Sequence, residues 1–137
     1  GHPGEDCSVW APEDRILRGG DTFGWGLVPR TTNLRPGAAA LLPDTHAKLI
    51  EFGAKTSVPG HGPLCTTQTL ERWVEYVLWL SRESVRLIAE GKADAEIAKH
   101  LAPPEDMTSW WRFLAWKHED SVMKVVKAAR RGWLEGV

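Results

Sequence analysis

The stretch that decides the fold is CSVWAPEDRILRGGD, at residues 7–21. Two short apolar runs, Ser8-Val9-Trp10 and Arg15-Ile16-Leu17, flank Ala11-Pro12-Glu13-Asp14. Pro-Glu-Asp is turn chemistry between strands, so the spacing predicts a β-hairpin. Gly19 and Gly20 are expected to end the second strand just before Asp21.

A third strand is predicted further along the chain, at Thr56-Ser57-Val58, where Pro59-Gly60-His61-Gly62-Pro63 stops it abruptly. Residues 22–43 are rich in glycine and proline and have few periodic apolar positions, so we expect a long loop there. A short helix over 45–53 follows, with Asp44 or Thr45 as its cap.

The rest of the chain is helical in pattern. Helices are expected over residues 67–90, 94–101, 105–116 and 119–133. The first has Gly91 as its C′ residue and one apolar stripe, formed by Leu70, Trp73, Val74, Val77, Leu78, Ser81, Val85 and Ile88.

Composition sets the broad class. The 137 residues are 42% hydrophobic and 26% charged, as in a soluble globular protein. A net charge of −1 and the lack of a long apolar run argue against nucleic-acid and membrane partners. Cys7 and Cys65 are expected to be free thiols. The chain opens Gly1-His2-Pro3 without methionine, which indicates a cleaved product, an expression product with a tag scar that ends in Gly-His, or a fragment of something longer. The absence of a visible signal peptide favours the cytoplasm only slightly.

One hairpin, one strand and several helices make too little sheet to stand alone, because helices cover only one of its faces. We therefore expect an α/β chain that is half of a sandwich, with residues 1–66 as a sheet-and-loop half and residues 67–137 as a helical region packed on it. The uncovered face is expected to pair with a missing N-terminal half, or with a second copy of the chain in a dimer.

Three residues are candidate metal ligands: His2, Asp21 and His61. Asp21 and His61 each follow glycine at a predicted strand end, where side chains of neighbouring strands converge. Imidazole nitrogen and carboxylate oxygen both suit zinc. Taken singly, a histidine in a turn is more often a hydrogen-bonding loop residue, and an aspartate after glycines is more often a turn or cap residue.

Residues 1–21 resemble the third and fourth motifs of the metallo-β-lactamase superfamily, and Val58-Pro59-Gly60-His61-Gly62-Pro63 is similar to its fifth. The resemblance implies the C-terminal half of an αββα sandwich. It also implies that His2 completes a first zinc site, that Asp21 bridges two ions and that His61 binds the second. In the complete protein, a metal-activated water would then attack a small ester, amide or thioester-type substrate.

The family's His-x-His-x-Asp-His motif does not occur in this sequence. The chain is therefore expected to hold one Zn²⁺ or none, and to have little hydrolytic activity by itself. Two other interpretations stay open. One is a non-catalytic module that self-associates through its sheet, and the other is a mononuclear metal-binding protein that uses only His2, Asp21 and His61.

Other conspicuous residues have plainer interpretations. Surface or packing roles are expected for His46, His100 and His118, and a solvated face for Lys124, Lys127, Arg130 and Arg131. Six tryptophans at helical spacing are expected mainly in the core, with a pocket wall or partner surface as the alternative. They are Trp73, Trp79, Trp110, Trp111, Trp116 and Trp133.

Overall fold

Three strands and four α-helices make up the part of the chain that the computed structural model describes, residues 7–25 and 38–134, with only the backbone of 38–43. In order they are β1 (Val9–Ala11), β2 (Ile16–Gly24), α1 (Ala38–Glu51), β3 (Thr56–His61), α2 (Thr67–Ala89), α3 (Asp94–His100), the 3-10 helix η2 (Glu105–Met107) and α4 (Ala115–Arg130). The mixed α/β class expected from the sequence is confirmed. None of these described helices combines the length and apolarity that crossing a bilayer requires.

The sheet has the order β1-β2-β3. Strands β1 and β2 are antiparallel and form the predicted hairpin, whose turn is closed by a bond from Arg15 N to Pro12 O of 3.3 Å. Strands β2 and β3 are parallel, and α1 lies in the crossover between them. Two strand ends that are distant in sequence therefore meet at one edge of the sheet.

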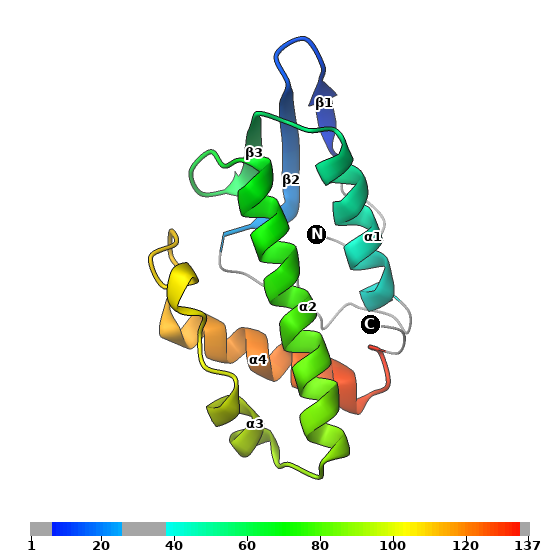
Figure 1. Ribbon diagram of the computed structural model, residues 1–137, viewed down its shortest axis with the longest axis vertical. Coiled ribbons are helices and arrows are strands. Elements are labelled where there is room, and N and C mark those ends of the chain that lie inside the picture. The colour runs from blue at the N-terminus through cyan, green and yellow to red at the C-terminus, as the bar shows by residue number, and fades with distance from the viewer. Residues whose placement is uncertain (1–6, 26–37, 135–137) are drawn as a thin grey trace.

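Helices α1 and α2 run side by side over one face of the sheet (Figure 1). On that face Leu17, Phe23 and Ser57 are buried. On the other face, Val9 is 59% exposed and Arg18 is also exposed. Among the described residues, the sheet is thus covered on one side only.

Helix α2 is the longest element and links the sheet to the helical region (Figure 1). Thr66 caps its start by accepting from Thr69 N at 3.4 Å. Gly91, with φ +79°, ends it as predicted. The bonds from Gly91 N to Ile88 O (2.9 Å) and from Lys92 N to Leu87 O (3.1 Å) form a Schellman motif.

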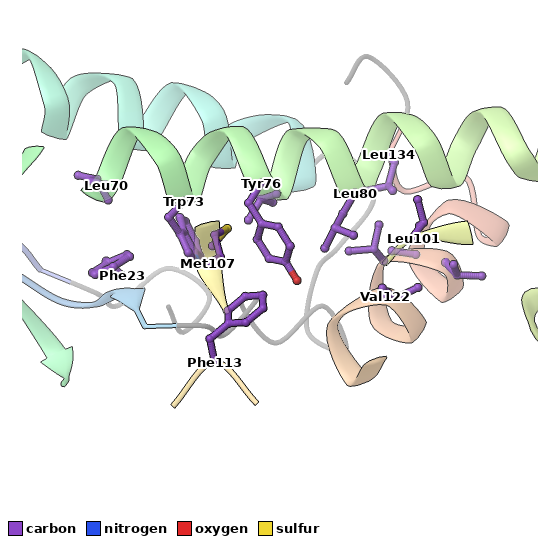
Figure 2. Close-up of a cluster of buried hydrophobic side chains, with 14 of the residues drawn as sticks. Phe23, Leu70, Trp73, Tyr76, Leu80, Leu101, Met107, Phe113, Val122 and Leu134 are labelled. Carbon is purple, nitrogen blue, oxygen red and sulfur yellow. The ribbon is translucent and has the colours of Figure 1, made fainter. Parts of the chain in front are cut away.

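The core lies along α2, where Trp73, Tyr76 and Leu80 are fully buried (Figure 2). Helix α4 packs against it with Val122, Val125 and Val126. The predicted stripe on α2 is wrong at Val85, which is exposed, because the sheet and α4 cover two different sides of the helix.

The long loop predicted over residues 22–43 is wrong at both ends. Strand β2 continues to Gly24, and α1 starts at Ala38 instead of 45. Alanine and leucine are strong helix formers, and the run Ala38 to Leu42 extends the helix in spite of Pro43. The rest of the predicted loop, residues 26–37, lies outside the described residues.

The predicted helix over 105–116 is also wrong. Only Glu105–Met107 is helical, and Arg112 has φ +54°, a left-handed conformation that an α-helix excludes. Helix α4 starts at Ala115 and ends at Arg130, earlier at both ends than the predicted 119–133. Gly132, with φ +70°, terminates it in a second Schellman motif.

Candidate metal centre

Asp21 owes its position to an irregularity in β2. The parallel pairing with β3 shifts register between Arg18 and Gly20, and again between Gly20 and Gly24. Gly20 has φ +53°, a conformation that glycine adopts without strain. The sequence prediction that Gly19 and Gly20 end the strand is therefore wrong, because they form a bulge instead. Bulges re-aim side chains, and this one turns Asp21 toward the end of β3.

His61 is the last residue of β3, and the glycine before it makes room for Asp21. A Cβ on Gly60 would lie 2.0 Å from Asp21 Oδ1 and 3.0 Å from Asp21 N. Any side chain at position 60 would thus displace the aspartate. The close approach of the two strand ends requires glycine at this position.

The structure brings Asp21 and His61 together, with 3.4 Å between His61 Nε2 and Asp21 Oδ1. This exceeds the 2.7–3.2 Å of an ordinary hydrogen bond. In a tetrahedral zinc site with ligand bonds of about 2.0–2.1 Å, two ligand atoms are roughly 3.4 Å apart. Both side chains are open to solvent, at 66% exposed for His61 and 39% for Asp21. The two groups therefore fit one divalent cation approached from outside.

The third candidate ligand, His2, lies outside the described residues. Within them, no group of three or more histidine, cysteine, aspartate or glutamate side chains is arranged to hold a metal ion. The described chain begins at Cys7, whose carbonyl oxygen would be 3.7 Å from a Cβ on Gly20. The segment entering β1 thus runs beside the residue that precedes Asp21.

Cys65 lies beside the start of β3, at the opposite end of the strand from His61, and is held as a neutral thiol. It pairs with Ser57 in an isolated bridge, and its Sγ donates to Ser57 O at 3.6 Å. Burial raises the pKa of Cys65 to about 11. Because only the thiolate is a good metal ligand, this cysteine is poorly suited to the site.

Two of the other histidines have packing roles. His46 is buried and its Nε2 donates to Thr22 O at 2.8 Å, which ties α1 to the part of β2 that carries Asp21. His118 is buried between Tyr76 and Leu101. His100, at the end of α3, is exposed. Of the surface and packing roles predicted for His46 and His118, the structure shows packing.

Sequence reasoning did not assign tryptophans to this edge. A Cβ on Gly62, which has φ +102°, would lie 2.4 Å from Trp25 Cδ1 and 2.8 Å from Trp111 Cε3. Trp25 Nε1 also donates to Pro63 O at 2.9 Å. The signal in the sequence was the second glycine of Pro59-Gly60-His61-Gly62, which marks a close approach by another group.

Comparisons of the chain with models of protein families, with curated proteins and with solved structures found no match. The metallo-β-lactamase resemblance accordingly rests on the sequence motifs alone, and the geometry of Asp21 and His61 is what favours a metal site.

Proposed function

We propose that this chain is the metal-binding C-terminal half of a zinc-dependent hydrolase of the metallo-β-lactamase type. The observation that supports this most is the 3.4 Å separation of His61 Nε2 and Asp21 Oδ1 at the shared end of two parallel strands. Ligand-binding side chains in layered α/β proteins gather at such strand ends.

In this proposal Asp21 and His61 are zinc ligands, and His2 is a third. A bound zinc ion would supply a hydroxide nucleophile near neutral pH. Asp21 would bind zinc through its carboxylate oxygens and His61 through its Nε2. A His-x-His-x-Asp-His segment would supply the further ligands that hydrolysis of an ester, amide or thioester requires.

Zinc titration of the purified chain by calorimetry tests the metal site. We expect one Zn²⁺ per chain, and at least a roughly 10-fold weaker affinity in His61→Ala and in Asp21→Asn. His100→Ala is the matched control, because it removes an exposed histidine far along the chain from the strand ends. Equal zinc affinity in all four proteins would contradict the proposal.

The hydrolase part has its own test. Asp21→Asn, made in the complete gene product, is expected to abolish zinc-dependent hydrolysis of ester and thioester substrates while circular dichroism stays unchanged. Full activity in this variant would exclude the proposed role of Asp21. A gene without a His-x-His-x-Asp-His segment would favour the mononuclear metal-binding protein.

Self-association is a second candidate function, supported by the uncovered face of the sheet. The register pairs Val9 with Arg18 and Arg18 with Val58, so their side chains lie on this face. Val9 is 59% exposed and Val58 is half-buried. Such a face is a natural surface for a second copy of the chain.

Sedimentation velocity checks this candidate. The wild-type chain is expected to sediment as a dimer and Val9→Glu as a monomer, because a buried carboxylate opposes association. Val85→Glu, on an exposed apolar position of α2, is the control and should remain a dimer. A monomeric wild type would exclude self-association through this face.

A further inference from the structure

Three tryptophans, Trp25, Trp110 and Trp111, pack together next to the candidate ligand pair. Trp25 follows β2, and Trp110 and Trp111 lie between η2 and α4. Figure 1 shows that the β3–α2 loop and the loop before α4 lie on the same side of α2. Trp25 and Trp110 meet edge to face, with ring centroids 5.1 Å apart. The ring of Trp111 lies so close to Gly62, the residue after His61, that a Cβ there would be 2.8 Å from Trp111 Cε3.

Trp111 differs from the other two because it is 40% exposed, whereas Trp25 and Trp110 pack against the core. Its outward position comes from the unusual backbone of Arg112, at φ +54°. This turn lets Phe113 enter the core, with Phe113 N bonded to Trp110 O at 3.0 Å, while Trp111 faces solvent. Strained backbone that exposes an indole points to a binding role.

A positive charge borders the exposed indole. The guanidinium of Arg112 lies 5.3 Å from the centre of the Trp111 ring. No carboxylate of the described residues pairs with it. Desolvation lowers the pKa of the neighbouring Lys117, and the positive charge of Arg112 lowers it further. The surface therefore combines a flat apolar ring with a cation that favours an anion.

We propose that Trp111 and Arg112 bind the non-reacting part of the substrate, a flat aromatic or conjugated group with a negative charge. This inference rests on the proposed function, because Asp21 and His61 would hold the reacting bond. The flat body stacks on the indole, and the guanidinium pairs with a carboxylate or sulfonate. Binding energy gained away from the reacting bond positions that bond.

The chain provides a matched control for this surface. Trp116 is 60% exposed, and Lys117 Nζ lies 5.6 Å from its ring centre. Trp116 with Lys117 has the same chemistry as Trp111 with Arg112. The three atoms nearest to a Cβ on Gly62, however, belong to Trp25 and Trp111. If naphthoate bound non-specifically to any exposed indole, substitution of Trp111 and of Trp116 would weaken its binding equally.

Calorimetric titration with 1-naphthoate, a flat aromatic carboxylate, tests the proposal in the metal-free chain. Because stacking on an indole carries most of the binding, Trp111→Ala is expected to weaken it about 10-fold. Arg112→Asn should weaken it about 3-fold, since an exposed ion pair contributes modestly and asparagine accepts the left-handed backbone. Trp111→Phe should restore most of the affinity, and Trp116→Ala should leave it unchanged.

The two proposals fail separately in this experiment. His61→Ala is expected to lose zinc affinity and to keep naphthoate affinity in the metal-free chain. Equal losses in Trp111→Ala and Trp116→Ala, or unchanged binding in Trp111→Ala, would overturn the substrate surface and leave the metal site standing. Unchanged zinc affinity in His61→Ala would contradict the metal site and leave the substrate surface standing.

Discussion

Two histidines near α2 have opposite surroundings. Beside the middle of the helix, His118 is buried and both of its ring nitrogens are hydrogen-bonded: Nδ1 lies 2.9 Å from Tyr76 Oη and Nε2 lies 2.6 Å from Leu101 O. Before its N-terminus, His61 is exposed, and a single carboxylate oxygen lies 3.4 Å from its Nε2. One histidine completes a packed core, and the other is available to a ligand.

The surroundings of the two histidines explain the difference. Leu101 O can only accept, so Nε2 of His118 holds the proton and Nδ1 accepts from Tyr76. Burial raises the pKa of Tyr76, which keeps the phenol protonated as the donor. Around His61, by contrast, the backbone is unusual, with glycines of positive φ at positions 20 and 62. The chain around His61 thus depends on glycine backbone and leaves its polar groups open to solvent, whereas the histidine in the core has both ring nitrogens occupied.

The largest expected effect separates the two histidines directly. His118→Ala leaves the Tyr76 hydroxyl and the Leu101 carbonyl without partners in the core, and we expect it to lower the free energy of unfolding by about 3–5 kcal/mol. His61→Ala should change it by less than about 0.5 kcal/mol. Urea denaturation followed by circular dichroism measures both changes. Similar losses of stability would show that His61 is as much a part of the packed core as His118.

The two cysteines give the next largest contrast. Burial raises the pKa of Cys65 to about 11 from 9.0, so at pH 8 its thiolate fraction should fall about 100-fold. Exposed Cys7 should therefore react with a thiol reagent at once, and Cys65 only after unfolding. Because the folded-state pKa is raised, Cys65 contributes stability below pH 9 that is lost as pH rises toward 11. Rapid reaction of two thiols in the folded chain would show that Cys65 is accessible.

Gly60→Ala tests whether the position of Asp21 depends on the close approach of the β2 and β3 backbones at Gly60. The added Cβ would lie 2.9 Å from Gly20 C as well as against Asp21. We therefore expect the free energy of unfolding to fall by about 1–3 kcal/mol and the zinc affinity to fall as well. Gly91→Asn is the control, since a Cβ there meets nothing within 4 Å and asparagine tolerates its φ of +79°. Unchanged zinc binding in Gly60→Ala would contradict the proposed geometry.

The smallest effect is a stabilisation in the core. Ser84 is buried on α2, and its Oγ finds no hydrogen-bond partner in the part of the chain that the structure describes. Ser84→Ala removes the unpaired hydroxyl and should raise the free energy of unfolding by about 1 kcal/mol. Ser81→Ala, whose hydroxyl donates to Val77 O at 2.9 Å, should bring no such gain. A higher melting temperature in the Ser84 variant alone is the expected result.

Elements with strong local signals could be predicted from the sequence. The hairpin around Pro12, α2 with its end at Gly91, and α3 all follow from turn residues, apolar periodicity and stop residues. Elements determined by tertiary contacts could not be predicted in this way. The Gly19-Gly20 sequence is as typical of a strand end as of the bulge that it forms, and nothing in the sequence indicates the left-handed backbone of Arg112.

The candidate site shows the same division. Glycine before Asp21 and on both sides of His61 indicated strand-end ligands, and the structure brings these two side chains together. The position of Trp111 beside Gly62 could not be predicted, because it depends on a loop nearly 50 residues away folding back onto Gly62. Long-range packing of this kind has no periodicity to detect.

The pairing of Ser57 with Cys65 has a consequence for aggregation. Ser57 N bonds Cys65 O at 2.7 Å and Cys65 N bonds Ser57 O at 2.9 Å, so both backbone groups of Ser57 on the outer side of β3 are occupied. Two residues further along the same side stands Pro59, which has no N–H to offer. Strand β3 thus presents a poor template for another strand, and the sheet resists growth into fibrils along this border.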